Sequence, residues 1–165
     1  MTDLHDVQAQ LRRLNDLEAI RTLRHRYAYL ANVIDGRLGD ADAFAALFSA
    51  DGTLDFGMGA ARGPEQIAAM LRGAAVDWQC AMHYMLNPLI ELAGDQATGR
   101  VAGLFAFTTR ARPEPVWMSN LYHDRYVRVA DEWKFAAVRV VPTFADPAVI
   151  EAYQALWNGR QTAAG

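Results

Sequence analysis

The chain has 165 residues, and because a domain commonly holds ~150 residues, the length predicts one domain spanning 1–165. Apolar residues make up 52% and charged residues 21% of the chain, which is typical of folded globular proteins and excludes a disordered one. The 16 basic and 19 acidic residues are scattered and give a net charge of −3. This pattern argues against nucleic acid as a partner.

The cysteine content and the hydropathy pattern bear on where the protein works. The single cysteine, Cys80, cannot form an internal disulfide, which favours a reducing compartment. No apolar run approaches the ~18 residues of a membrane span, and the N-terminus lacks the charged-then-apolar pattern of a signal peptide. We therefore expect a cytoplasmic protein with no membrane partner.

The first third of the chain has the periodicity of a helix. Apolar residues recur there at steps of three and four, which is the period of one buried helix face. Asn15 and Glu18 resemble a capping box, so we expect this helix to begin near Asp16 and to end at Gly36. The apolar positions are Ile20, Leu23, Tyr27, Leu30 and Ile34.

Three further helices are expected around it. A separate leading helix is expected at about 4–14 and a short one at about 40–48. Gly63-Pro64-Glu65 begins another, since proline suits the first helical position, and this helix should reach about residue 72.

The rest of the chain is predicted to be mostly strand. Two short strands at 53–56 and 60–62 flank Gly57 and Gly59 and predict a hairpin. Four long strands joined by short turns predict an antiparallel meander. These long strands are expected at about 82–92, 96–111, 116–129 and 133–144, followed by a last helix at about 147–157. Helices first and a long sheet afterwards indicate an α+β fold.

The long strands carry apolar residues on both faces, for example Leu104 beside Phe105. One face can pack under the helices, whereas the other would be an unusually large exposed patch on a monomer. We therefore expect a homo-oligomer, a dimer or a trimer, formed through the outer face of the sheet.

Two residues stand out as candidates for chemistry. Asp35 follows the apolar face of the long helix, where it is either a solvated loop acid or a carboxylate held at a pocket mouth. His83 lies among apolar residues early in the first long strand, where it is either a satisfied core residue or a general base. A carboxylate paired with a histidine would fix its tautomer and stabilise the imidazolium, but the spacing alone does not show that the two meet.

A series of short motifs, in this order and spacing over about residues 10–145, resembles the SnoaL-like branch of the nuclear-transport-factor-2-like superfamily. Within that branch the chain is most similar to scytalone dehydratase, the bile-acid dehydratases and hexachlorocyclohexane dehydrochlorinase. The motifs are Tyr27…Asp35, Phe48-Ser49-Ala50-Asp51-Gly52, Gly63-Pro64-Glu65-Gln66-Ile67, His83-Tyr84…Asn87-Pro88, Gly94-Asp95-Gln96-Ala97 and Glu132-Trp133-Lys134-Phe135.

The resemblance implies a cone-shaped, strongly curved antiparallel sheet wrapped around the N-terminal helices, with an apolar pocket between them. In those enzymes an aspartate at the end of the first helix pairs with a histidine on the following long strand, and the histidine is the general base of an elimination. The resemblance assigns these positions to Asp35 and His83. Phe56 and Phe107 stand where scytalone dehydratase has a tyrosine and a second histidine, which argues against that particular substrate.

The expected substrate pocket combines large aromatics, methionines and a few polar groups, which suits an apolar ring-containing ligand. Arg139 is added because it lies within a residue of a strand arginine used by the dehydrochlorinase. Tyr27 is either a core or a pocket residue. The other expected lining residues are Phe56, Met58, Met70, Trp78, Met85, Phe105, Phe107, Asn120, Tyr122 and Phe144, with Trp157 from the last helix.

From these positions we expect a cofactor-free dehydratase that eliminates water from a hydroxy-ketone of polyketide-, steroid- or aromatic-like type, with the Asp35–His83 dyad as base. Two alternatives stay open: an isomerase or cyclase using the same proton abstraction, and a non-catalytic module that binds a small molecule. The scattered histidines and the lone cysteine predict no metal site, and the lack of a phosphate-binding loop predicts no nucleotide cofactor.

Overall fold

The computed structural model describes residues 3–57 and 59–147. Met58, Trp157 and the helix expected at about 147–157 therefore fall outside the described residues, apart from Pro147 itself. In chain order the elements are α1 (Leu4–Ala31), β1 (Val33–Ile34), β2 (Arg37–Leu38), α2 (Ala41–Ala45), β3 (Phe48–Asp55), β4 (Ala60–Arg62), α3 (Gly63–Ala75), β5 (Trp78–Ala93), β6 (Gln96–Thr109), β7 (Val116–Val129) and β8 (Glu132–Ala145).

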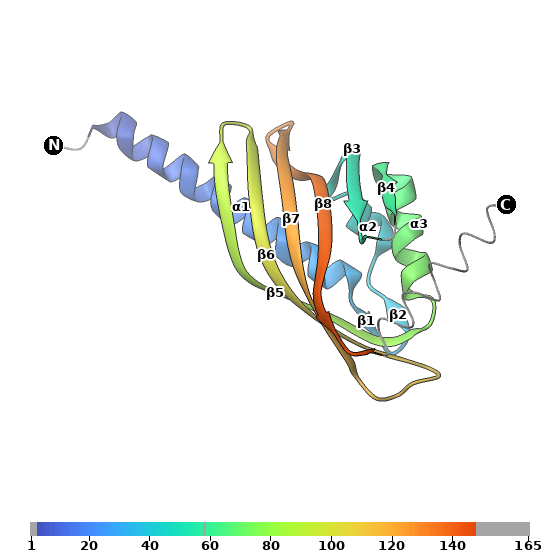
Figure 1. Ribbon diagram of the computed structural model, residues 1–165. Helices are drawn as coiled ribbons and strands as arrows, with labels where there is room; N and C mark the ends of the chain where they lie inside the picture. Colours follow the sequence, from blue (N-terminus) through green and yellow to red (C-terminus); the bar gives the residue numbers. More distant parts are fainter. Residues whose placement is uncertain (1–2, 58, 148–165) are drawn as a thin grey trace.

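The predicted α+β architecture is confirmed: one strongly curled sheet, a half-barrel, wraps around the helices (Figure 1). The strand order is β2-β1-β5-β6-β7-β8-β3-β4, and the long strands β5 to β8 form the predicted antiparallel meander. The β3–β4 hairpin is also as predicted, with Asp55 opposite Ala60. One pairing was not foreseen: β3 lies parallel to β8 and extends the sheet beyond the meander.

The first helix differs from the prediction at both ends. There is no separate leading helix, because α1 begins at Leu4 behind the N-cap Asp3 and runs without a break to Ala31. It also ends before Gly36, since Asn32 is already extended and Val33 pairs with Ala81 of β5. A β-branched pair, Val33-Ile34, favours a strand at this point, and the pairing with β5 outweighs the helical spacing that had included Ile34.

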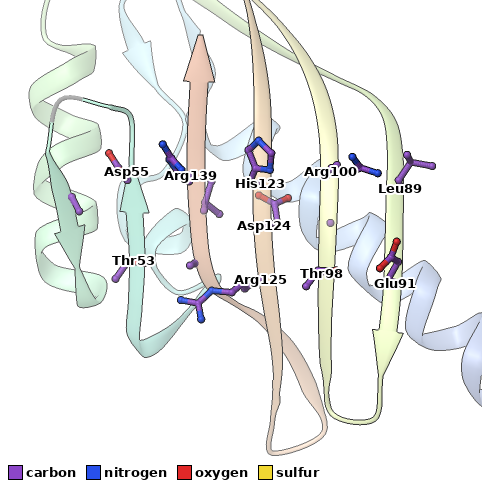
Figure 2. A pocket seen from close by; sticks show the side chains of 14 residues that line it. Thr53, Asp55, Leu89, Glu91, Thr98, Arg100, His123, Asp124, Arg125 and Arg139 are labelled. Carbon is purple, nitrogen blue, oxygen red and sulfur yellow. The ribbon is translucent and has the colours of Figure 1, made fainter. Parts of the chain in front are cut away.

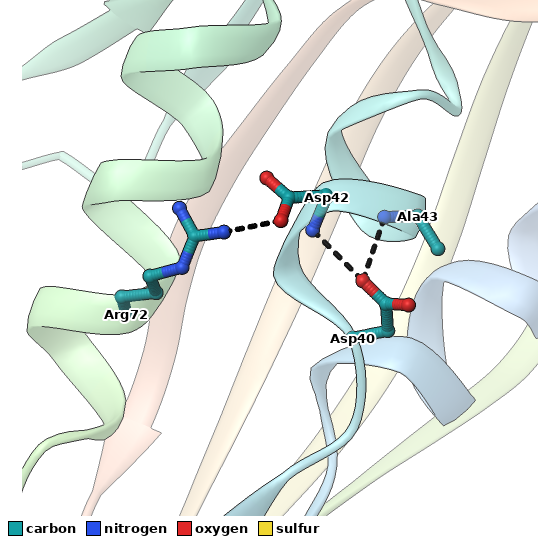
Figure 3. Close-up of polar contacts among 4 residues, drawn as sticks. All are labelled: Asp40, Asp42, Ala43 and Arg72. Carbon is teal, nitrogen blue, oxygen red and sulfur yellow. Dashed lines mark hydrogen bonds and ion pairs between the residues drawn. The ribbon is translucent and has the colours of Figure 1, made fainter.

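The two shorter helices fasten to each other beside the sheet. Asp40 caps α2 by accepting hydrogen bonds from the backbone N–H groups of Asp42 and Ala43, at 3.0 and 2.9 Å. Asp42 in turn forms an ion pair with Arg72 of α3 at 2.5 Å (Figure 3). Both ends of this pair are exposed, so its contribution to stability is small, ~0–1 kcal/mol.

Alternation along the strands separates the two faces of the sheet. On β7 the even-numbered residues from 116 to 126 point inward under the helices and are buried, whereas His123 and Arg125 are exposed on the outer face. The inward face and the helices together form the core, which includes Ile20, Tyr27, Phe44, Leu54, Ile67, Tyr126 and Phe135. The core fills one end of the half-barrel and leaves a cavity toward the other.

Candidate functional site

A cavity of about 360 Å³ opens inside the half-barrel, between the sheet and the C-terminal ends of α1 and α3. This volume lies in the range of ~300–1,000 Å³ typical of ligand pockets. Aromatic rings form much of its wall: the Trp78 ring lies 5.3 Å from that of Phe105, and Phe105 stacks on Phe107 at 5.2 Å. The polar groups are few, as a site for a mostly apolar ligand requires. They include His83 and Asn120.

His83 is held by Asn32, the residue at which α1 gives way to β1. The backbone N–H of His83 donates to Asn32 Oδ1 at 2.8 Å, and the ring Nδ1 lies 3.1 Å from the same oxygen. The Phe105 ring lies against the imidazole, with centroids 4.5 Å apart. Asn32 is buried, so both contacts are shielded from solvent.

These two contacts determine the tautomer of His83. A backbone N–H can only donate, so the Asn32 atom facing it is the carboxamide oxygen, and that oxygen can only accept. Nδ1 therefore carries the ring proton, and Nε2 keeps its lone pair. Because His83 lines the cavity whereas Asn32 does not, Nε2 is the ring nitrogen on the cavity side and presents a hydrogen-bond acceptor to a ligand.

The electrostatic surroundings keep this imidazole neutral. Burial disfavours the imidazolium, and the positive charge of Arg24 adds to the effect, so that the pKa of His83 falls from 6.5 to about 3. No carboxylate offsets these effects, because the residue that contacts Nδ1 is an amide. His83 is consequently uncharged throughout the physiological pH range.

The structure does not bring Asp35 and His83 together, so the predicted dyad is not confirmed. Val33 pairs with Ala81, and the Gly36 N–H donates to the Gln79 carbonyl at 2.7 Å, so the chain runs away from His83 after Val33. Asp35 lies in the tight turn between β1 and β2, exposed and with φ of 52°. Asp35 lies level with Gln79, and Gln79 is four residues from His83 along β5, which corresponds to about 13 Å at ~3.3 Å per residue. The position that meets His83 is held by Asn32.

Asn120 supplies the second deep polar group of the cavity. It is only 4% exposed, and its Oδ1 has no hydrogen-bond partner within the described part of the chain. A buried polar atom without a partner costs roughly 1–3 kcal/mol, so Asn120 Oδ1 is available to accept a hydrogen bond from the cavity.

Two tyrosines connect the cavity to a buried ion pair. Tyr27 and Tyr122 line the cavity, and the Arg24 guanidinium lies between their rings, 4.4 and 4.2 Å from the two centroids. Arg24 also forms a 3.0 Å ion pair with Asp124. Asp124 in addition accepts a hydrogen bond from the Tyr126 hydroxyl at 2.7 Å.

The guanidinium between the rings is held by cation–π attraction as well as by its ion pair. Burial alone would lower the pKa of Arg24, but the Asp124 carboxylate raises it above its ordinary value. Tyr27 was predicted to be either a core or a pocket residue. It is both, because it is 1% exposed and also lines the cavity.

A glycine makes room for one of these tyrosines. Gly103 on β6 lies under the Tyr122 ring, and a Cβ at this position would overlap that ring. Gly103 thus positions a cavity wall that the sequence alone did not explain.

Eight of the predicted site residues line the cavity together. They are Tyr27, Phe56, Trp78, His83, Phe105, Phe107, Asn120 and Tyr122. Met58 and Trp157 lie outside the described residues.

Three predicted substrate residues and Met70 lie elsewhere. Met85 and Met70 pack against the main core. Phe144 is 64% exposed at the end of β8. Arg139 is on the outer face of the sheet, beside Arg100, His123 and Arg125 (Figure 2). Its side chain points away from the cavity because its neighbour Val140 points into it.

Several residues that line the cavity were not predicted, although strand alternation in the sequence indicates some of them. Met118 has the same parity on β7 as Asn120 and Tyr122, so strand alternation places it on the same face. Val140 similarly follows from β8. Phe44 and Leu71 come from helices, where no alternation was available. The other lining residues not predicted are Ala31, Gly73, Ala74, Val76, Asp77, Thr109 and Pro142.

The described residues hold neither a cluster of metal ligands nor a helix that could span a membrane. Within 3–57 and 59–147, no three histidine, cysteine, aspartate or glutamate side chains gather as metal ligands. Of the helices in the same ranges, none has the length and hydropathy needed to cross a membrane.

Comparison with known proteins identifies relatives of this fold. The SnoaL-like domain profile matches residues 12–139. No curated protein gives a significant match. Among solved structures, an NTF2-like protein with a cystatin-like fold from Novosphingobium aromaticivorans is 26% identical, with a TM-score of 0.74 over 90% of this chain and 95% of that one.

Two solved structures with enzyme names are similar in fold. A candidate scytalone dehydratase from N. aromaticivorans is 21% identical, with a TM-score of 0.72 over 81% of this chain and 88% of that one. The hexachlorocyclohexane dehydrochlorinase LinA-type3 from Novosphingobium barchaimii is also 21% identical, with a TM-score of 0.73 over 84% and 93%. At these identities the likeness to both establishes the shared fold.

Proposed function

The chain belongs to the SnoaL-like domain family, and we propose that it is a cofactor-free lyase that eliminates water from an apolar, ring-containing hydroxy-ketone. The observation that carries the proposal is the fixed tautomer of His83. Its Nε2 lone pair faces an aromatic cavity in which a neutral base can approach a C–H bond without competing water.

The proposed reaction uses residues that line the cavity. His83 Nε2 takes the proton from the carbon next to the ligand carbonyl, and the C–H electron pair moves into the enolate. The Asn120 carboxamide, Tyr27 or Tyr122 donates a hydrogen bond to the enolate oxygen. The enolate then re-forms the carbonyl, with a new C=C bond, and expels the β-hydroxyl, which takes the proton from the imidazolium and leaves as water.

The low pKa of His83 slows the first proton transfer of this reaction and favours the second. An imidazole with a pKa of about 3 is a weak base, so proton abstraction is slow. Its conjugate acid is correspondingly strong and returns the proton readily to the leaving hydroxyl. Abstraction is therefore the proposed rate-limiting step, and it is the step that a stronger base would accelerate.

A second function is binding without turnover, and Asn32 is the observation that favours it. An amide in contact with Nδ1 fixes the tautomer but does not stabilise an imidazolium as a carboxylate would. In that case the cavity would hold its ligand through the His83 and Asn120 acceptors.

The test is a panel of ring-containing hydroxy-ketones incubated with the protein and followed by mass spectrometry. Elimination predicts a product lighter by one water. A product of unchanged mass would indicate an isomerase or a cyclase, and saturable binding with no product would indicate a binding module.

Matched variants separate these outcomes further. Asn32→Asp places a carboxylate against Nδ1, so we expect a higher pKa of His83 by NMR and faster turnover. Asp35→Asn is the control and should change neither, because Asp35 lies in the β1–β2 turn. His83→Gln should lower kcat by about 100-fold or more, the usual share of a general base. Turnover that is indifferent to both Asn32→Asp and His83→Gln would contradict the proposed role of His83.

A further inference from the structure

The first three turns of α1 stand clear of the other described residues. Every residue from 3 to 15 is exposed, and the helix extends past β5 at the edge of the sheet (Figure 1). Side-chain contact with the sheet begins at Asp16, which forms a 2.7 Å ion pair with Arg128 and accepts a 3.1 Å hydrogen bond from Trp133 Nε1. A free helix of this length is marginal in water, so a partner that covers it would stabilise it.

This exposed part carries an apolar stripe. Leu4, Val7, Leu11 and Leu14 are 70%, 47%, 57% and 61% exposed. Their steps of three, four and three residues are the a and d positions of two successive heptads. At 3.6 residues per turn they fall within a sector of about 80° on one side of the helix.

The stripe faces away from the chain's own core. The residues that α1 buries against the sheet, from Ile20 to Ala31, are centred about 150° around the helix from the stripe. The chain's own sheet packs against the opposite side of α1 and therefore does not cover the stripe. None of the residues that the structure describes covers the stripe, so its apolar side chains are open to a second molecule.

We propose that a second copy of the chain covers the stripe, with the two α1 helices packed antiparallel over residues 4–14. The spacing is self-complementary about Ala9: Leu4 meets Leu14 of the partner subunit, and Val7 meets Leu11 of the partner subunit. Among the residues beside the stripe, Gln8, Gln10 and Asn15 are uncharged and Asp3 is acidic. The inference does not depend on the chemistry of the cavity.

Charge selects the antiparallel direction. Asp3 and Asp6 lie at the start of the segment, whereas Arg12 and Arg13 lie at its end. Antiparallel packing brings the acidic end of one helix alongside the basic end of the other, and parallel packing would bring like charges together. These charges cancel within the segment, so it lacks the basic excess typical of helices that bind anionic lipid.

The first experiment measures the mass of the full chain in solution over a concentration series, by sedimentation or light scattering. Leu11→Glu combined with Leu14→Glu should at least halve the mass at concentrations where the wild type is associated. Ala9→Glu is the matched control, since Ala9 is exposed on the opposite side of the same helix, and it should keep the wild-type mass. A wild type that stays monomeric, or a double variant with unchanged mass, would overturn the proposal.

A second experiment tests the direction. In a Cys80→Ser background, Leu4→Cys and Leu14→Cys chains are oxidised separately and as a mixture. Antiparallel packing predicts a disulfide-linked dimer chiefly in the mixture, joining one chain of each kind. Dimers formed equally well by each variant alone would contradict the antiparallel arrangement, and no linked dimer in any sample would contradict helix pairing.

Discussion

Two clusters of polar side chains lie at the concave face of the sheet, and they differ in how completely they are enclosed. Arg24, Asp124 and Tyr126 form a cluster in which the two charges pair at 3.0 Å and both charged residues are 2% exposed. Asn32, His83 and Asn120 form the other, which contains no formal charge and opens onto the cavity. In the first cluster the two charges pair with each other, although Arg24 Nε and Nη1 have no hydrogen-bond partner among the described residues, whereas in the second the Asn120 Oδ1 lacks a partner beside the cavity.

The difference follows from the cost of burial. Removing an ion from water costs several kcal/mol, which a counter-charge in close contact offsets in part, so Arg24 and Asp124 are buried as a pair. A neutral imidazole or carboxamide costs less to leave incompletely bonded, and the site can keep these groups available. We infer that the charged pair, the closed cluster, contributes mainly to the fold, and we propose that the neutral open cluster beside the cavity is the functional site.

The largest effect is expected from breaking the closed cluster. Asp124→Asn leaves the Arg24 guanidinium buried without a counter-charge, and we expect a loss of ~3–5 kcal/mol in the free energy of unfolding, measured by urea denaturation. The exposed pair provides the control, since Asp42→Asn should cost less than ~1 kcal/mol. Equal losses in the two variants would show that Arg24 finds another partner or water, and would end the distinction drawn between the clusters.

The second prediction uses the acidity of His83. Its pKa is about 3 in the folded protein against 6.5 when solvated, so between these values the unfolded chain binds the proton and the native protein does not. Wild-type stability should therefore fall, relative to His83→Phe, as the pH drops from 6.5 to about 3. Denaturation of both proteins over this range measures the difference. Parallel curves would mean that His83 is not held neutral.

The two clusters also differ in how far the sequence predicted them. Tyr122 was correctly predicted to line the cavity, and its strand neighbour His123 lies on the outer face, as a period of two requires. The meander was predicted from turn residues, and Gly94 and Asp131 do adopt positive φ values there. Arg24 was missed because hydrophobic periodicity treats an arginine as a surface residue, although α1 buries this one between two tyrosine rings.

The error at Asp35 has a different origin. Helical spacing continued to Ile34, and only the pairing of Val33 with Ala81, some 50 residues further along the chain, ends α1 at Ala31. A non-local contact of this kind leaves no local signal, and a shift of a few residues was enough to assign the dyad position to an aspartate instead of Asn32. The predicted subunit contact through the outer face of the sheet and the cytoplasmic location stay predictions.

A smaller effect is expected from the open cluster. Asn120→Leu removes a buried oxygen that has no partner in the described residues and replaces a carboxamide by an apolar group of similar size. We expect unchanged or slightly higher stability, because the cost of that oxygen, roughly 1–3 kcal/mol, disappears. Ligand affinity, measured by calorimetry with a compound from the hydroxy-ketone panel, should fall by a similar amount. A loss of stability instead would mean that the Asn120 side chain stabilises the fold, as the closed cluster does.

The smallest effects separate two neighbours on one strand. Val140 lines the cavity, and Arg139 lies exposed on the outer face. Val140→Ala should weaken ligand binding by ~1 kcal/mol through lost apolar contact, whereas Arg139→Gln should leave affinity and stability within ~0.5 kcal/mol of wild type, as surface substitutions usually do. Because the two residues share a backbone segment, a general disturbance of β8 would affect both. Weaker binding in Arg139→Gln alone would mean that the ligand binds at the outer face of the sheet. This result would contradict the proposal that the cavity is the ligand site.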